Sequence, residues 1–383
     1  MAAADSESPA PSRSTRRLGA ALIALVWIVL LPLTGLAMAE WWIGSGLFQR
    51  AGRAPYYTKL WEAYHPFAIQ YPNPFYLFFF PLEPERRLAI GNEIVSIDEN
   101  GFRGPGPEAA DGRKLGFLIG GSAAFGAYSS SDETTITAYM NDLQDEFHFV
   151  NAGVPSWNTT QELLRLILQL LPYEPDLVIA YDGANDAAIL NRYLRWDQDF
   201  PPGTPENFDV LYEMVAELHR GGQNHVPLFQ RFFPRVRREV QEEFVKARAR
   251  KNPPNEADIE RSVAAYAYNH QVMHDILRVR GARFVGVFQP ILSMHRGVPE
   301  SHKKAVRIPI YQKFHALAMG EYRPSFEFHD LSTYFDSLFD AVPSAAVNRG
   351  EEVVAETVFI DDAHLHDAGN ELIAREIVSR LGL

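Results

Sequence analysis

The chain has 383 residues, of which 46% are hydrophobic, and 48 acidic against 36 basic side chains give a net charge of −12. This acidic balance argues against a nucleic-acid partner, because such proteins usually present a basic face. The sequence contains no cysteine, which excludes disulfides, thiolate catalysis and Cys-ligated zinc. The length suits one large domain with an insertion, or two modest domains.

An uncharged stretch lies close to the N-terminus. Residues 1–17 are small and polar and end in arginines, and residues 18–39 carry no charged side chain. As a helix rising about 1.5 Å per residue, this stretch would extend about 33 Å, enough to cross a hydrocarbon core of about 30 Å. We therefore predict a cytoplasmic tail at 1–17 and a transmembrane anchor at 18–39. The remainder is expected in the periplasm, because arginines precede the stretch.

The same stretch also fits a cleaved signal peptide, because Ala37-Met38-Ala39 has the small-x-small pattern of a cleavage site. The mature protein would then be secreted after cleavage at Ala39. Both interpretations export residues 40–383. The aromatic and proline-rich residues 40–113 are expected to form a juxtamembrane segment that packs on the domain or the bilayer surface. Within it, Asn100-Gly101 predicts a tight turn.

From residue 114 onward, short apolar runs alternate with helical patterns. Runs that suit buried parallel strands lie at 114–121, 147–154, 176–186 and 282–290, and the third is expected to end in a loop. Helical patterns lie at 159–171, with a threonine cap, from 255 to Gly281, and at 368–381. This alternation predicts an α/β domain over 114–383 with a mostly parallel sheet. Residues 191–254 break the rhythm and are expected to form a helical insertion or cap.

Polar residues that suit acyl chemistry follow several of these runs. Ser122 follows the first run, and the carboxyl ends of parallel strands are where such sheets bind ligands. A serine reacts only with a base, an orienter for that base, and donors for the developing oxyanion. Asp361, three residues before His364 on the closing loop, can hold the ring by Nδ1 and leave Nε2 facing the serine. The candidate oxyanion donors are the backbone amides of Ser122 and Gly153 and the side chain of Asn185.

Four blocks, "IGGSAAFG", "NAGVPSWNT", "YDGAND" and "DDAHLHDAGN", occur in this order, and each joins a strand to a loop. In sequence and order they resemble the blocks of the SGNH (GDSL-like) hydrolase family. The resemblance covers residues 114–190 and 282–383. It implies a three-layer α/β/α fold of the flavodoxin-like, SGNH hydrolase type.

The resemblance also assigns roles to individual residues. It places Ser122 as the nucleophile and His364 with Asp361 as the base and its orienter. The oxyanion hole that it implies consists of Ser122, Gly153 and Asn185. One position departs from the family pattern, because Gly121 stands where the first block usually has Asp. That Asp is not part of the nucleophile–base pair, so its loss need not remove catalysis.

Other polar residues near these blocks have simpler interpretations. His366 is a rival base, but the residue three before it is Ala363, which cannot orient a ring. A His-x-His pair beside aspartates can suggest a metal site, yet no third protein ligand is evident, so neither metal nor cofactor is predicted. Asp362 and Asp186 are expected to make structural hydrogen bonds, and His270 is expected to be a core histidine.

Three functions are compatible with the sequence. The first is a serine esterase that removes O-acyl (acetyl) groups from a carbohydrate or another extracytoplasmic ester, with an acylated polysaccharide as the leading candidate. The second is an O-acyltransferase in cell-surface or exopolysaccharide modification, which would use the same acyl-enzyme. The third is a non-catalytic carbohydrate-binding or scaffold protein, for which Gly121 is the only sequence support. The expected partners are the ester substrate and, through the N-terminal helix, the membrane.

Overall fold

The computed structural model describes residues 27, 30–44, 71–73, 77–79, 90–91, 94–98, 100–155, 157–189, 256–296, 298, 308–321, 323–342 and 357–383. The chain divides into two compact units, residues 1–52 with 224–244, and residues 53–223 with 245–383. The tail predicted at 1–17 and the insertion predicted at 191–254 lie outside the described residues, as do much of 18–39 and most of 40–113. The predictions for these segments stay predictions.

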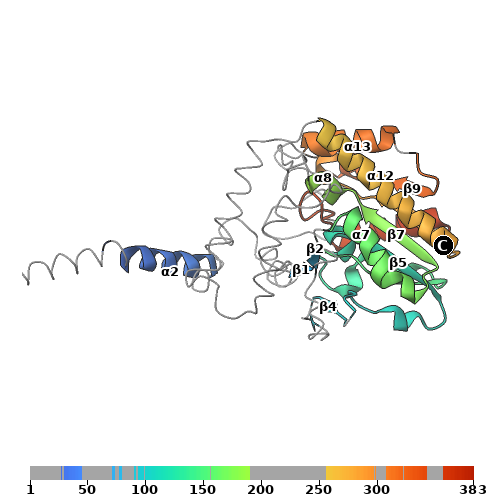
Figure 1. The fold of residues 1–383 in the computed structure, drawn as a ribbon, viewed down its shortest axis with the longest axis horizontal. Helices are drawn as coiled ribbons and strands as arrows, with labels where there is room; N and C mark the ends of the chain where they lie inside the picture. Colours follow the sequence, from blue (N-terminus) through green and yellow to red (C-terminus); the bar gives the residue numbers. More distant parts are fainter. Residues whose placement is uncertain are drawn as a thin grey trace, which may run out of the picture. The chain divides into compact units, whose positions relative to one another are not determined.

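In the first unit, the structure describes a helix, α2 (Leu31–Gly44), drawn in blue in Figure 1. Several of its apolar side chains are exposed, among them Leu31, Leu33, Met38 and Trp41. Across the described parts of the chain, no helix combines the length and the apolar character that crossing a membrane requires.

Within the described residues of the second unit, five parallel strands form the central sheet (Figure 1). They are β5 (Lys114–Gly120), β6 (Phe147–Asn151), β7 (Leu177–Asp182), β8 (Arg283–Phe288) and β9 (Glu327–Asp330). Their order in the sheet is β6-β5-β7-β8-β9, with every neighbouring pair parallel. This is the flavodoxin-like order, in which ligands bind where the strand order reverses, here beyond the carboxyl ends of β5 and β7. The predicted α/β fold class is confirmed.

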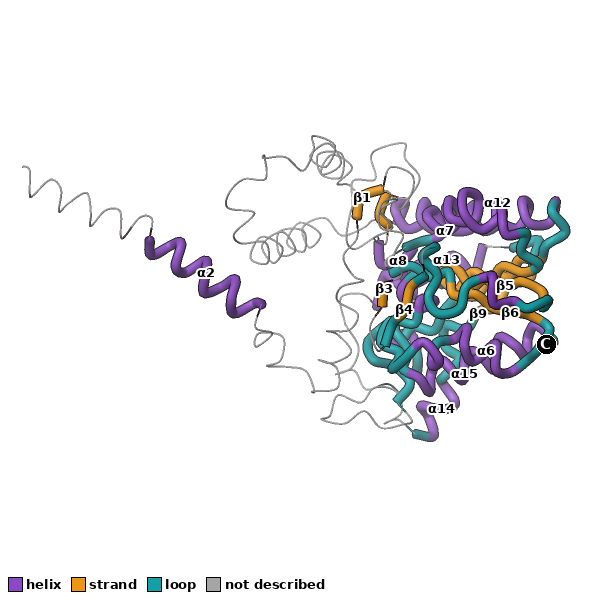
Figure 2. Tube along the Cα trace, turned by 90° about the horizontal axis from the view of Figure 1, so that it is seen from below, coloured by secondary structure: helices purple, strands orange, loops and turns teal. Residues whose placement is uncertain are grey.

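Helices cover both faces of this sheet (Figure 2). Successive side chains of a strand point to opposite faces, so β5 contributes to two cores. Leu118 packs in a cluster with apolar residues of α6 (Ile136–Leu143), α14 (Asp336–Ala341) and α15 (Asp367–Leu381). Phe117 and Ile119 pack in a second cluster, with residues of α7 (Thr159–Arg165) and α12 (Glu256–Val279). The three-layer arrangement follows from this alternation.

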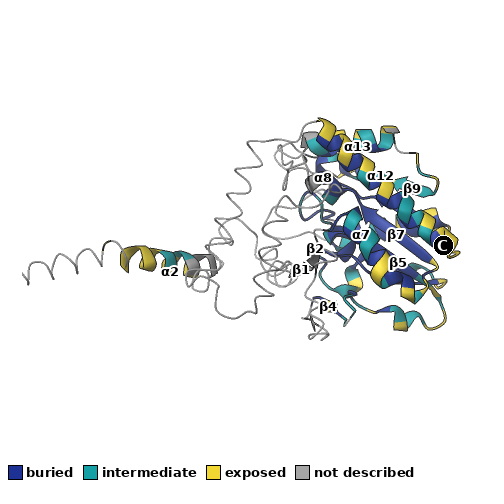
Figure 3. Cartoon of the chain, viewed as in Figure 1, coloured by how far each residue is buried: buried dark blue, intermediate teal, exposed yellow. Residues whose placement is uncertain are grey.

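The middle strand of the sheet, β7, is buried along its length, and α12 shows an exposed outer stripe (Figure 3). As predicted, α12 begins close to residue 255 and is followed by Gly281, whose φ of 79° is left-handed. Its inner face packs with α8 (Ala184–Ile189) and α13 (Ile308–Glu321) in a third apolar cluster.

The structure corrects three local predictions. The cap of α7 is Asn158 rather than a threonine: its side chain accepts from Thr160 N and Gln161 N. The helix predicted at 159–171 also changes character, since π-helical η5 (Leu166–Leu170) and 3-10 η6 (Leu171–Tyr173) follow α7. The third strand, predicted at 176–186 with a loop at its end, stops at Asp182, and helix α8 begins at Ala184 in place of that loop.

Short elements precede and connect the main ones. In the second unit, β1 (Tyr71–Asn73) pairs with β2 (Leu77–Phe79), and β3 (Ile90–Gly91) pairs with β4 (Ser96–Ile97), both antiparallel. The tight turn predicted at Asn100-Gly101 is present: Gly101 has φ 79°, and Asp98 accepts from the amides of Asn100 and Phe102. The remaining elements are α5 (Ser122–Phe125), η3 (Pro107–Ala110), η4 (Asp132–Thr134) and η7 (Leu292–Met294).

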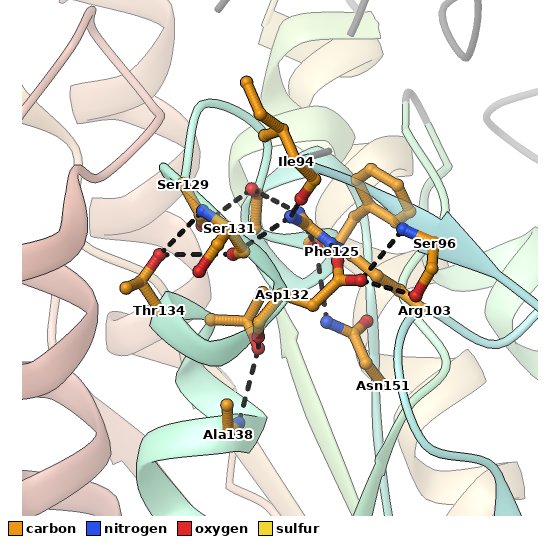
Figure 4. A network of polar contacts seen from close by, with 12 residues as sticks. Ile94, Ser96, Arg103, Phe125, Ser129, Ser131, Asp132, Thr134, Ala138 and Asn151 are labelled. Atoms are coloured by element: carbon orange, nitrogen blue, oxygen red, sulfur yellow. Dashed lines mark hydrogen bonds and ion pairs between the residues drawn. The ribbon is translucent and has the colours of Figure 1, made fainter. Parts of the chain in front are cut away.

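A buried arginine connects the segment before β5 to the turn that follows α5 (Figure 4). The Arg103 side chain is 0% exposed, and its Nε lies 2.7 Å from Asp132 Oδ1. Its Nη1 donates to Phe125 O at 3.0 Å and Gly126 O at 2.7 Å. Its Nη2 donates to Ile94 O at 3.1 Å and to Ser131 O, directly before η4, at 3.2 Å. One cation thereby fixes backbone from three segments of the chain.

Replacing this arginine should destabilise the fold. We expect Arg103→Met to lower the free energy of unfolding by about 3 kcal/mol, because it removes the ion pair with Asp132 and one hydrogen-bond donor from each of several buried carbonyls. Urea denaturation of the full chain measures the loss. Arg375→Met is the matched control: its exposed pair with Glu371 should contribute no more than about 0.5 kcal/mol. Equal losses in the two variants would contradict the structural role of Arg103.

Candidate active site

Ser122 lies at a sharp transition from strand to helix. At Gly120, φ is 148° and an added Cβ would lie 2.2 Å from Tyr181 O, so only glycine allows β5 to approach β7 this closely. Gly121 caps the short helix α5, and Ser122 is its first residue. The Ser122 side chain is therefore presented at the carboxyl edge of the sheet, where it is partly exposed.

His364 lies on a tight loop that directly precedes α15. Phe359 and Leu365 pair as an antiparallel bridge at the base of this loop, and Ile360 N donates to His364 O at 2.9 Å. At the tip, Asp361 Oδ1 accepts from Ala363 N at 2.9 Å and from His364 N at 3.0 Å. The backbone thus positions the carboxylate independently of the imidazole.

The three side chains meet in one hydrogen-bonded line. His364 Nδ1 lies 2.8 Å from both carboxylate oxygens of Asp361, and His364 Nε2 lies 2.6 Å from Ser122 Oγ. The imidazole is 19% exposed and the carboxylate 33%. Because a carboxylate only accepts, Nδ1 carries the proton, and Nε2 is left to accept the hydroxyl hydrogen of Ser122. This arrangement can deprotonate the serine as it attacks.

The segment that follows β8 supports the histidine loop from one side. Asp362 Oδ1 accepts from Ser293 N at 3.0 Å, and Asp362 O accepts from Leu292 N at 2.9 Å. Gln289 Nε2 donates to Ala363 O at 3.1 Å. Asp362 therefore makes the structural hydrogen bonds that the sequence suggested, and Gln289 is a supporting residue that sequence reasoning missed.

The loop after α5 supports the histidine from the other side. Ser130 N donates to Asp367 Oδ1 at 2.9 Å, and Asn370 Nδ2 donates to Ser129 Oγ at 3.0 Å, which ties this loop to α15. The preceding residue, Tyr128, has a left-handed φ of 71°, unusual for a bulky side chain. Its ring meets the His364 ring edge-on, with 5.2 Å between centroids. Sequence patterns carried no signal for this contact.

Two of the candidate oxyanion donors already have acceptors within the protein. Asn185 lies in the first turn of α8 and its Nδ2 donates to Trp157 O at 2.7 Å, which leaves the second amide hydrogen for another acceptor. Gly153 packs against α5, since an added Cβ would lie 2.3 Å from Phe125 N. Its own N–H, however, donates to Asn151 Oδ1 at 3.1 Å. The roles of Asn151 and Trp157 were not foreseen from the sequence.

The other polar residues considered from the sequence are engaged elsewhere. His366 N donates to Val358 O at 2.7 Å, and its Nε2 lies 3.9 Å from Asp367, while burial lowers the pKa of the ring. His270 is buried, with its Nε2 2.8 Å from Asp182 Oδ2. Within the ranges that the structure covers, no three His, Cys, Asp or Glu side chains are grouped so as to hold a metal ion.

The sequence matches no family model and no curated protein. Among solved structures, the chain is similar to the acetyl xylan esterase AlAXEase, with 13% identity, a TM-score of 0.39, and coverage of 70% of this chain and 99% of that one. It is also similar to a variant of an acetyl xylan esterase from Geobacillus stearothermophilus, with 12% identity, a TM-score of 0.39, and coverage of 70% of this chain and 94% of that one. A GDSL-like lipase from Parabacteroides merdae is similar with 11% identity, a TM-score of 0.38, and coverage of 70% of this chain and 97% of that one. These TM-scores are too low to carry an inference about family or activity.

A group of buried acids lies beneath the turn that carries Asn185. It consists of Glu162 on α7, Asp182 at the end of β7, and Asp186 on α8, with His270 of α12 beside them. Burial, together with the neighbouring Asp182, raises the pKa of Asp186 to about 7, although hydrogen bonds from Thr159 act in the opposite direction. Burial, Asp182 and Asp186 also raise the pKa of Glu162. Glu162 and Asp186 therefore bind their protons more tightly than exposed carboxyl groups do.

The raised pKa predicts how stability depends on pH. Folded Asp186 binds its proton more tightly than the unfolded chain does. Proton binding at Asp186 therefore contributes fully to the free energy of unfolding below about pH 4, and this contribution is lost as pH rises towards about 7. Asp186→Asn keeps an oxygen that can accept from Thr159 but cannot ionise. We expect this variant to lose less stability than the wild type between pH 5 and pH 8, by about 1 kcal/mol or more. Urea denaturation at the two pH values measures this, and parallel pH profiles would contradict it.

Proposed function

We propose that the protein is a serine esterase in which Ser122 is the nucleophile, His364 the general base and Asp361 its orienter. The observation that carries this proposal is the 2.6 Å contact between Ser122 Oγ and His364 Nε2, with Nδ1 of the same ring on Asp361. A serine that only capped a helix would not require a histidine–carboxylate pair at its hydroxyl.

The first half-reaction is acylation. Ser122 Oγ attacks the ester carbonyl carbon while its proton moves to His364 Nε2, and the Asp361 carboxylate stabilises the imidazolium that forms. The tetrahedral intermediate then collapses by breaking the bond from carbon to the alcohol oxygen. His364 returns the proton to that oxygen, so an alcohol leaves and the acyl group stays on Ser122.

The second half-reaction is hydrolysis. Water attacks the acyl carbon and gives a proton to His364 Nε2. The second tetrahedral intermediate then collapses by breaking the bond from carbon to Ser122 Oγ, which takes the proton back from His364, and the carboxylic acid leaves. In both halves, the Ser122 amide and the second hydrogen of Asn185 Nδ2 are the proposed oxyanion donors. The Gly153 amide joins them by sharing its hydrogen between Asn151 and the oxyanion.

The proposed substrate is an O-acyl group, acetyl in particular, on a carbohydrate or another extracytoplasmic ester. The motif resemblance supports this substrate class. The uncharged residues 18–39 support the periplasmic location. An O-acyltransferase would share the acylation step and differ only in passing the acyl group to a sugar hydroxyl.

Reaction with a fluorophosphonate probe tests the nucleophile without knowledge of the substrate. We expect the full chain to be labelled at Ser122, identified by peptide mass. His364→Ala should slow labelling by about 10²-fold or more, because the hydroxyl then lacks its base. His366→Ala is the matched control: it removes a nearby histidine that does not contact Ser122, and it should label at close to the wild-type rate.

The opposite result would refute the proposal. Folded wild-type protein that is not labelled at Ser122 would point to the non-catalytic, carbohydrate-binding alternative. Equal labelling rates in the wild type and His364→Ala would show that His364 is not the base.

A further inference from the structure

Gly121, the position that departs from the family pattern, does not owe its glycine to backbone conformation. Its φ of −80° and ψ of −152° are extended values that any residue adopts. The constraint is steric: an added Cβ would lie 2.2 Å from Asn185 Nδ2 and 3.1 Å from Trp157 O. The amide of Asn185 thus occupies the space that a side chain at 121 would need.

The neighbours of that amide determine which group would move. Asn185 Nδ2 is bonded to Trp157 O at 2.7 Å. The Trp157 carbonyl belongs to a buried residue whose own N–H donates to Val154 O at 3.2 Å and whose ring lies beside the Arg165 guanidinium. A side chain at 121 would therefore displace the terminal amide of Asn185 rather than the Trp157 backbone.

We propose that Gly121 is a positioning residue for Asn185. The missing side chain keeps the amide bonded to Trp157 O and directly beside the turn that carries Ser122, where its second hydrogen can reach an oxyanion. This inference rests on the proposed esterase function. It also gives the glycine a role within catalysis, because in this chain a side chain at 121 and the observed position of Asn185 exclude one another.

A positioning role has a specific kinetic consequence. Oxyanion hydrogen bonds strengthen in the transition state, so their loss lowers kcat while KM changes little. Removing one such donor typically costs about 10²–10³-fold in kcat. We expect Gly121→Ala to lower kcat for p-nitrophenyl acetate by about 10²-fold and to slow fluorophosphonate labelling of Ser122 similarly.

A double-mutant cycle separates this role from a general structural one. The variants are Gly121→Ala, Asn185→Ala and the double variant, all in the full chain. If Gly121 acts through Asn185, the double variant should have about the same kcat as Asn185→Ala alone. Gly320→Ala is the matched control, because nothing lies within 4 Å of the added Cβ. It should leave kcat unchanged.

Thermal unfolding tests the steric part without any activity. Gly121→Ala should lower the Tm because of the clash, and the double variant should recover most of that loss, because the displaced amide is gone. This comparison holds even where Gly121→Ala alone folds poorly.

Three outcomes would overturn the inference: wild-type kcat in Gly121→Ala, losses in kcat that multiply in the double variant, or a Tm that Asn185→Ala does not restore. Failure of the proposed function is a distinct outcome, since the wild type itself would then not be labelled at Ser122.

Discussion

The hydrogen bond between Ser122 Oγ and His364 Nε2 joins residues 242 positions apart in the sequence, and the rest of the described domain serves to bring its two loops together. Parallel strands place all their carboxyl ends at one edge, so the loop after β5 and the loop before α15 can meet there. A contact of this length tolerates little displacement, because hydrogen bonds weaken steeply with distance and misalignment. Precision in the backbone is therefore the main requirement on the fold.

Buried polar side chains supply much of that precision. Arg103 holds the carbonyls of Phe125 and Gly126 at the end of α5, the helix that begins at Ser122, and Asn151 donates to the first of them. Desolvating a cation is costly, and the cost is offset only when its hydrogen bonds are made with good geometry. Such groups add little net stability but disfavour alternative arrangements of the loops. Burial also raises the pKa of Glu162 and of Asp186, so these two carboxyl groups bind protons more tightly than exposed ones do.

Sequence patterns predicted the sheet and the meeting of its loops because each central strand is an apolar run closed by glycine or a polar residue. The edge strand β9 escaped prediction, since its four residues, "EFHD", are half exposed and carry no apolar run. The candidate triad was predicted from the position of Ser122 after a strand, from the spacing of Asp361 and His364, and from the motif resemblance. The partners of Gly153 and Asn185 were not predicted, because a side-chain or backbone acceptor such as Asn151 Oδ1 or Trp157 O is chosen by tertiary packing.

If Ser122 is the nucleophile, the acyl group of the substrate is bonded to Ser122 Oγ during turnover. Quenching the full chain during turnover of p-nitrophenyl acetate, followed by intact mass and peptide mapping, tests this directly. We expect a burst of p-nitrophenol, accompanied by an acetyl group on Ser122 that disappears once the substrate is exhausted. Turnover at wild-type rate without acetylated Ser122, or with the acetyl group on another residue, would contradict it.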